Sequence, residues 1–124
     1  MRQSIELPDQ PFLRPNDRPH WSKRHRLTRD WRGAVELVAR AELKPVTVPV
    51  DVTLSMVAPD KRRRDSDSLS LALKAAVDGL VDAGICKDDS WLYVGRTSCE
   101  ILPPDGSKRR SWWLTIVEQE VPRG

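Results

Sequence analysis

The sequence predicts a single α/β (α+β) domain in which helices pack on a mixed sheet and the elements follow in the order β-α-β-α-β-β. Its length of 124 residues fits one domain, since domains typically run about 50–200 residues. Hydrophobic residues make up 39% of the chain and charged residues 31%, which excludes a disordered chain. Along the chain, apolar residues recur at every second position in some segments and at every third or fourth position in others. The first spacing predicts strands and the second helices, which gives the order of elements.

The first part of the chain predicts a short strand, a long basic connection and a helix. Ser4 to Leu7 alternates polar and apolar side chains, and Pro8 ends this strand. The connection that follows is rich in proline and in basic residues, and such long connections are usually functional or disordered. Thr28 is a suitable N-cap for a helix that runs to about Leu43, and Pro45 stops it.

The middle of the chain predicts a strand and a second helix. Residues 46–56 alternate apolar and polar side chains, and Pro49, which cannot donate to a ladder, indicates an edge or a bulge. Ser68 to Ala83 carries apolar residues at helical spacing. Gly84 is a natural residue to follow the end of that helix.

The C-terminal part predicts two strands joined by a turn. Trp91 to Leu102 reads as a strand, and Pro103 to Gly106 as the turn after it. Ser111 to Glu118 is then expected to be the antiparallel partner of the strand before the turn.

The cysteines, the histidines and the start of the chain narrow the class of protein. No apolar signal sequence follows Met1, so Cys86 and Cys99 are expected to be reduced thiols. His20 and His25 have no acidic or thiol neighbours, which favours solvated or phosphate-contacting side chains over a zinc site. The apolar runs are too short to span a bilayer, and we therefore expect a cytoplasmic protein.

The distribution of charge is more informative than the net charge of +3. One basic stretch runs from Arg14 to Arg40, and a second, from Lys61 to Arg64, is continuous. Aspartates are concentrated directly after the second stretch. They are Asp65, Asp67, Asp78, Asp82, Asp88 and Asp89.

Asp65 and Asp67 follow the basic run at the predicted boundary between a strand and a helix. Two residues apart in an extended chain, their side chains can point to the same side and hold one cation. Mg²⁺ prefers carboxylate oxygens and usually keeps several waters and a substrate phosphate. The alternative, in which Asp67 or Ser68 caps the helix and Asp65 pairs with an arginine, stays open on these residues alone.

A second acidic pair, Asp88 and Asp89, follows the second helix. A helix of about sixteen residues is ~24 Å long, so this pair cannot reach the start of the helix along the helix itself. It approaches Asp65 and Asp67 only if the strand from Trp91 runs antiparallel or adjacent to the preceding strand. The sequence pattern does not decide this arrangement.

Three segments, in order, resemble the signature of the RusA family of Holliday junction resolvases (crossover junction endodeoxyribonucleases), particularly the phage and prophage versions. Pro59 to Leu69 contains the basic run and the Asp-x-Asp motif, Lys74 to Leu80 the lysine and Asp-x-Leu, and Ala83 to Asp89 the Ala-Gly and Asp-Asp pairs. The rest of the chain agrees with the family in arrangement more than in residues. Ser68 stands where the family usually has asparagine.

The resemblance implies a homodimeric α/β nuclease that uses Mg²⁺, with Mn²⁺ as a substitute, to cut four-way DNA junctions in recombination and repair. Asp65 and Asp67 match the first two catalytic, metal-binding acids of the family, and Asp89 matches the third. Lys74 matches the helix lysine if a short insertion after the Asp-x-Asp motif is accepted. The ion would polarise the scissile phosphate, and Lys74 or a neighbouring arginine would stabilise the added negative charge.

Both basic stretches are expected to neutralise DNA phosphates, so that binding falls steeply with salt. Trp21 either stacks on an exposed base or packs beneath the connection. The tryptophans of the periodic segments, Trp31, Trp91, Trp112 and Trp113, are expected in the core or in a dimer interface. The predicted DNA-binding residues are Arg18, Trp21, Lys23, Arg24, Arg26, Lys61, Arg62, Arg63 and Arg64.

Two other functions stay open at this point. One is a protein that binds branched DNA without cleaving it. The other is a less selective metal-dependent nuclease that acts on flaps or single strands.

Overall fold

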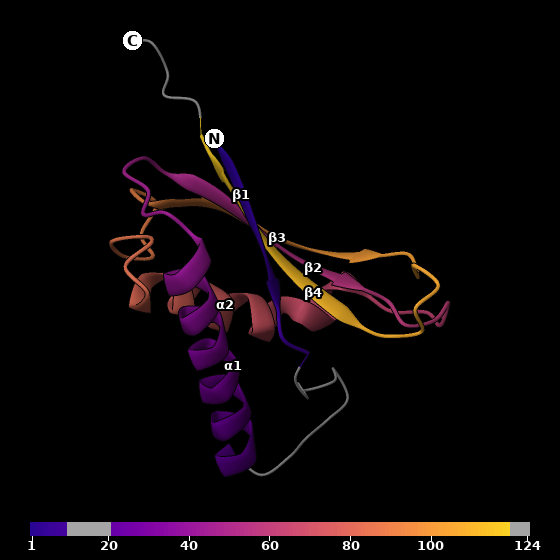
Figure 1. Ribbon diagram of the computed structural model, residues 1–124. Coiled ribbons are helices and arrows are strands. Elements are labelled where there is room, and N and C mark those ends of the chain that lie inside the picture. The colour runs from indigo at the N-terminus through magenta and orange to yellow at the C-terminus, as the bar shows by residue number, and fades with distance from the viewer. Residues whose placement is uncertain (10–20, 120–124) are drawn as a thin grey trace.

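Four strands form one mixed sheet, and two α-helices pack against one of its faces (Figure 1). The computed structural model of the chain describes residues 1–9 and 21–119. The predicted mixed α/β domain with helices packed on a mixed sheet is confirmed. The elements in chain order are β1 (Arg2–Leu7), α1 (Trp21–Glu42), β2 (Val50–Val57), the 3-10 helix η1 (Ser66–Leu69), α2 (Ser70–Asp82), β3 (Val94–Leu102) and β4 (Ser111–Glu118).

The predicted hairpin of the last two strands is wrong, because β2 lies between them in the sheet order β1-β4-β2-β3. β2 pairs parallel with β3 and antiparallel with β4, and β4 also pairs antiparallel with β1. β4 buries Trp112, Leu114 and Ile116 on the helix-covered face, which suits a central strand, whereas most of β3 is exposed and suits an edge. Residues 103–110 therefore connect strands that are not neighbours.

α1 begins at Trp21, well before the predicted N-cap at Thr28. The prediction followed the apolar stripe, and the first described side chain of α1 that is buried is Trp31. Residues 22–30 bury no side chain, but they contain neither proline nor glycine and so can continue the helix.

β2 and β3 both begin later than predicted. β2 starts at Val50, directly after Pro49, whose missing N–H therefore costs no ladder bond. β3 starts at Val94 because the carbonyl of Ser90 accepts hydrogen bonds from the N–H groups of Tyr93 (2.9 Å) and Val94 (2.8 Å), which form a turn.

The predicted second helix is divided into η1 and α2. Asp65 precedes η1 and Asp67 lies within it, so the Asp-x-Asp motif comes before the regular α-helix begins at Ser70. Gly84 follows the helix with a φ of +76°, as predicted, and the N–H of Ile85 donates to the carbonyl of Leu80 at 3.0 Å.

Trp31 lies at the centre of the core between the sheet and both helices. Its side chain is completely buried, and its indole N–H donates to the carbonyl of Ala72 in α2 at 2.9 Å. The ring packs edge-on against Trp112 of β4, with the ring centroids 5.1 Å apart. Trp31 and Trp112 are thus core residues, as expected, whereas Trp91 and Trp113 are exposed.

α1 and α2 are in close backbone contact at Gly79. A Cβ atom at this position would lie 2.8 Å from the carbonyl oxygen of Arg32 and 2.9 Å from the Cβ of Val35. Both contacts are closer than real Cβ atoms show, so only glycine allows this helix spacing.

We predict that Gly79→Ala lowers the free energy of unfolding by about 1–3 kcal/mol, because the added methyl group forces the helices apart. Gly33→Ala is the matched control, since a Cβ there meets no atom within 4 Å. This control should raise stability by roughly 0.5–1 kcal/mol through helix propensity. Urea unfolding followed by circular dichroism measures both, and equal stabilities of the two variants would contradict the close helix contact.

Candidate functional site

Asp65 and Asp67 lie where the loop after β2 enters η1. Asp65 is extended, with φ −103° and ψ 134°, and its backbone carbonyl accepts a hydrogen bond from the N–H of Ser68 at 3.0 Å. Both aspartates are exposed, and no side-chain hydrogen bond caps η1 or α2. Within residues 1–9 and 21–119, neither carboxylate takes part in an ion pair or a side-chain hydrogen bond. Among the residues that the structure describes, neither helix capping nor pairing with an arginine is observed for them.

The arginines beside this pair are held by Asp60 instead. The Asp60 carboxylate accepts hydrogen bonds from the Arg62 N–H at 3.0 Å and from the Arg62 guanidinium at 3.1 Å, and it pairs with Arg64 at 2.9 Å. Arg64 also donates to the backbone carbonyls of Asp60 and Arg62. These contacts lower the pKa of Asp60 to about 2, and the hydrogen bond from the backbone N–H of Arg62 has the largest effect. The loop is thus folded around its own charges.

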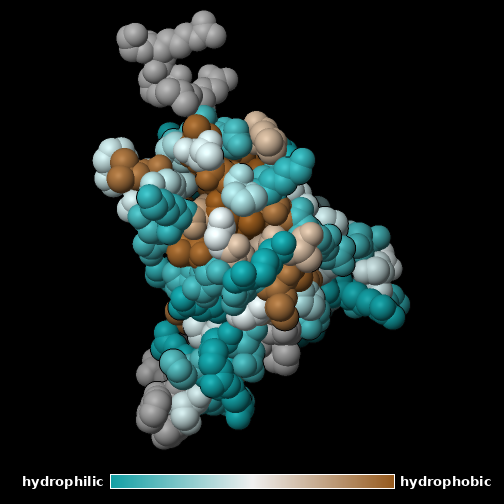
Figure 2. Space-filling model, turned by 60° about the vertical axis from the view of Figure 1, so that its left-hand side comes forward, coloured by the Kyte–Doolittle hydropathy of each residue, from teal (hydrophilic) through white to brown (hydrophobic). Residues whose placement is uncertain are grey.

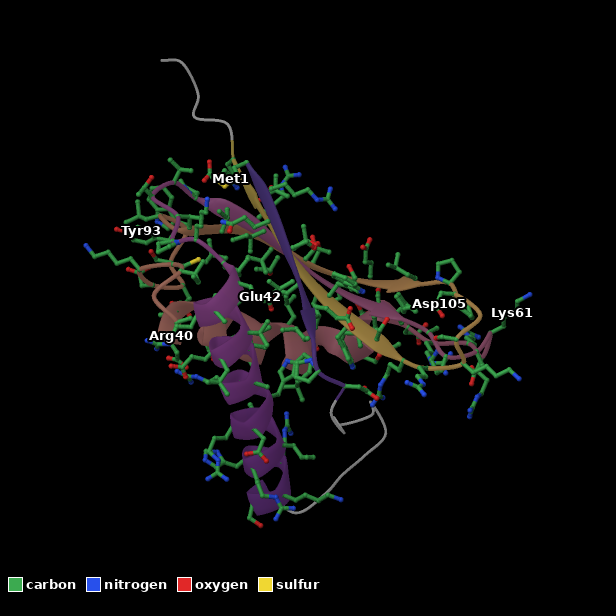
Figure 3. All side chains as sticks on the ribbon, in the orientation of Figure 1. Met1, Arg40, Glu42, Lys61, Tyr93 and Asp105 are labelled. Atoms are coloured by element: carbon green, nitrogen blue, oxygen red, sulfur yellow. The ribbon has the colours of Figure 1, made fainter. Side chains whose placement is uncertain are left out.

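Lys61 and Arg63 are exposed and make no ion pair within the described residues. Figure 3 shows Lys61 at the outer end of the sheet, near Asp105 of the connection between β3 and β4. Two of the four cations of the second basic stretch are therefore directed to solvent, and the other two shape the loop that displays them.

Lys74 of α2 bridges two aspartates. Its Nζ atom lies 3.1 Å from Oδ2 of Asp89 and 3.2 Å from Oδ1 of Asp78. These two hydrogen bonds raise the pKa of Lys74, and the bond to Asp89 has the larger effect. Since Asp89 belongs to the loop of residues 83–93, the bridge ties this loop to α2. The structure therefore brings Lys74 and Asp89 together and adds Asp78 to them.

The bridge continues into α1 through Arg32. One guanidinium nitrogen of Arg32 lies 3.9 Å from Asp78, and the guanidinium makes two hydrogen bonds with the carboxylate of Asp82, one of them 2.8 Å long. The bond to Arg32 lowers the pKa of Asp82. Alternating charges thus connect the loop of residues 83–93 with both helices.

The parallel pairing of β2 with β3 separates Asp89 from Asp65 and Asp67. The latter two follow the C-terminal end of β2, whereas Asp89 precedes the N-terminal end of β3. Lys61 and Tyr93, which belong to the two loops, lie at opposite ends of the sheet in Figure 3. In the part of the chain that the structure describes, no three His, Cys, Asp or Glu side chains are grouped as a metal site requires.

The N-terminal part of α1 forms a basic projection beside the body of the domain. Lys23, Arg24 and Arg26 are exposed, and no acidic residue lies in the first helical turn. The positive end of the helix dipole adds to these charges and favours a bound anion. Figure 1 shows this end of α1 pointing away from the sheet, and Figure 2 shows a hydrophilic surface over it. Trp21 is the first residue of α1, and Arg18 lies outside the described residues.

Cys86 and Cys99 are free thiols, as predicted. Burial raises the pKa of Cys86. Burial and, second, the negative charge of Asp67 raise the pKa of Cys99 in β3. The acidic end of η1 therefore lies close to β3.

Three residues near these groups were not among the predicted site residues. Asp78 lies one helical turn after Lys74, a spacing that favours an ion pair on a helix and was a usable signal. Asp60 lies directly before the basic run and Asp65 directly after it, so the sequence does not show which of the two pairs with the arginines. Trp91 has an exposed fraction of 79%, and nothing in the sequence separates it from the buried tryptophans.

The chemistry available to these groups falls into two parts. The carboxylates of Asp65 and Asp67 can hold a hard divalent cation that retains waters and a phosphate oxygen. The cations of the loop after β2 and of α1 can neutralise phosphates. Among the described residues, no helix is both long and apolar enough to cross a membrane.

No family model matches the chain. The chain is 33% identical over 87 residues to an uncharacterized protein of Xylella fastidiosa (strain Temecula1 / ATCC 700964). This similarity covers 65% of the chain and 57% of that protein, so the chain spans little more than half the length of its relative.

We predict that Lys23→Glu increases the helicity of the first turns of α1, because a negative charge at a helix N-terminus is worth about 0.3–1 kcal/mol at low salt. Arg40→Glu is the control with the opposite sign. It places an acid at the C-terminal end and removes the contacts of Arg40 with Glu36 and the carbonyl of Asp82. Far-UV circular dichroism and amide hydrogen exchange report both changes. Equal loss of helicity in the two variants would contradict the dipole argument.

Proposed function

We propose that this protein is a divalent-metal-dependent endodeoxyribonuclease that acts on four-way DNA junctions as a homodimer. The observation that carries the proposal is the pair of exposed carboxylates at Asp65 and Asp67, which no described residue engages, beside a loop that turns Lys61 and Arg63 to solvent. The ordered resemblance of residues 59–89 to the RusA family supports the choice of substrate.

Asp65 and Asp67 fit a Mg²⁺ site of the kind that relies on one or two carboxylates and on substrate oxygens. Mn²⁺ has the same preference for oxygen ligands. When bound, such an ion supplies charge stabilisation at the scissile phosphate and a water of lowered pKa. Asp89 is the third acid of the proposal, and its carboxylate is bonded to Lys74 at 3.1 Å, so its participation requires this ion pair to open.

In this proposal the ammonium group of Lys74 pairs with Asp89 before the reaction and contacts the DNA phosphate during it. In the bridge it neutralises Asp78 and Asp89. If Asp89 took part in holding a metal ion, the ammonium group of Lys74 would lose this partner and could stabilise negative charge that develops on the phosphate.

Lys61, Arg63 and the first turns of α1 would neutralise the DNA backbone. Arg64 would have an indirect role, because Asp60 and the backbone carbonyls of the loop occupy its donors. Arg62 also pairs with Asp60, but its side chain stays exposed and can contribute to binding. Two subunits related by a twofold axis would bring two such surfaces to opposed strands, which suits paired cuts across a junction.

A protein that binds branched DNA without cleaving it is the second candidate. It is favoured by the ion pair between Lys74 and Asp89 and by the opposite ends of the β2–β3 pair from which the acids come.

Incubation with a synthetic four-way junction and Mg²⁺ separates the candidates. Paired, symmetric nicks support the resolvase, and binding without nicks supports the second candidate. Equal cutting of linear or flapped DNA would instead indicate a less selective nuclease.

We predict that Asp67→Asn keeps junction binding and lowers the nicking rate by about 100-fold or more, since a bound metal ion contributes several kcal/mol to transition-state stabilisation. Asp105→Asn is the matched control. Asp105 is an exposed aspartate near Lys61, and its carboxylate accepts a hydrogen bond from Ser107 within its own turn. Wild-type nicking by Asp67→Asn would remove this residue from the mechanism.

We predict that the double variant Lys61→Ala, Arg63→Ala lowers the salt dependence of DNA binding by about two phosphate contacts, that is, by a log–log slope of roughly 2. Arg64→Ala should change this slope much less, because the donors of Arg64 serve the loop. Fluorescence anisotropy between low and moderate salt gives the slopes. The assignment of roles in the loop fails if Arg64→Ala has the larger effect on the slope.

A further inference from the structure

Two large apolar side chains, Trp91 and Leu92, stand exposed in the loop that carries Asp89. Their exposed fractions are 79% and 53%, although Trp31 and Trp112 are almost completely buried. Single exposed apolar residues are common on proteins, but an exposed indole beside a candidate catalytic aspartate is a specific arrangement.

The backbone that displays Trp91 is held in a defined turn. The carboxylate of Asp88 accepts a hydrogen bond from the N–H of Ser90 at 2.8 Å, and the carbonyl of Ser90 accepts two from the residues just after Leu92. On the other side of the turn, Asp89 is tied to Lys74 of α2 at 3.1 Å. The indole is therefore presented from a fixed base, which reduces the conformational entropy that a ligand would have to remove.

The charges around Trp91 select the kind of surface that it can meet. Asp88 and Asp89 lie three and two residues before it, and their charges are offset by Lys87 and by Lys74, which is paired with Asp89. This flank therefore offers no net attraction to a phosphate backbone, whereas an uncharged, planar nucleobase needs none. Trp91 is also only two residues from Asp89, so at most ~7 Å separates their Cα atoms, which is about the reach of one nucleotide.

We propose that Trp91 stacks on a nucleobase that is unpaired or unstacked at the branch point and so gives the protein its preference for branched over linear DNA. This inference rests on the proposed function for its substrate and adds to it a specificity-determining residue. An indole has a free face for every base, so the contact selects the exposure of a base and not its identity. A fully paired duplex offers such a face only at its ends.

The test uses the full chain without divalent cation, so that binding is measured apart from cleavage. The probes are a four-way junction, a single-stranded oligonucleotide and a long duplex, with affinities read by fluorescence anisotropy. Trp91→Ala should weaken binding of the junction and of the single strand by about tenfold and of the duplex by less than about twofold. Trp91→Phe should retain most of the affinity. Leu37→Ala, at another exposed apolar residue on α1, is the control and should change nothing.

A second readout is the quenching of tryptophan fluorescence when the single-stranded oligonucleotide binds. Most of this quenching should disappear in Trp91→Phe. The inference is overturned if Trp91→Ala leaves all three affinities unchanged or weakens them equally. It is also overturned if the variant converts a dimer to a monomer in sedimentation, because Trp91 then belongs to an interface between copies of the chain.

The two proposals fail in different ways. A wild-type protein that shows the Trp91-dependent preference but never nicks a junction contradicts the nuclease and supports the stacking role. A wild-type protein that nicks junctions while Trp91→Ala binds and cuts like it contradicts the stacking role alone.

Discussion

The packing of both helices against the sheet depends on the burial of Trp31. Its ring fills the space between α1, α2 and β4, and its single polar atom is satisfied by the carbonyl of Ala72. A buried indole N–H without a partner would be costly, so α2 cannot shift along α1 without breaking this bond. The glycine at position 79 then allows the backbones to approach as closely as this hydrogen bond requires. The start of α2, and with it the acidic turn of η1, is fixed relative to the sheet by these packing contacts rather than by any contact of the acids themselves.

The same topology determines how the candidate site is divided. A strand, a helix and a parallel strand must place the two loops at opposite ends of the strand pair, and the helix has to cover the distance between them. Asp65 and Asp67 therefore follow one end of the strand pair and Asp89 precedes the other, and Lys74 joins the loop that carries Asp89 to α2.

The sequence was sufficient for the class of fold, for the second helix and its terminal glycine, and for the limits of β4, because regular apolar spacing and backbone chemistry are local properties. It failed for the pairing of the last two strands, because strand pairing is a long-range property. β3 pairs with β2, which precedes α2 in the chain, and not with β4, which follows β3 directly. It also missed the first turns of α1, where Lys23 and Arg24 form a helix without an apolar stripe. At the candidate site it found Asp65 and Asp67 but not Asp60, because the choice among several acids beside one run of arginines is made by the shape of the loop.

The row of charges formed by Asp89, Lys74, Asp78, Arg32 and Asp82 has a consequence for how substitutions in this region combine. Each inner member pairs with two neighbours, so removing Lys74 or Arg32 leaves the aspartate at that end of the row without its partner, while Asp78 keeps the other cation. Removing the unpaired aspartate as well restores part of the charge balance. Energies of single substitutions along this row will therefore not sum. Double-mutant cycles that pair a substitution in the loop of residues 83–93 with one in α1 measure the interaction energy between them. A non-zero interaction energy indicates that the loop and α1 are energetically coupled.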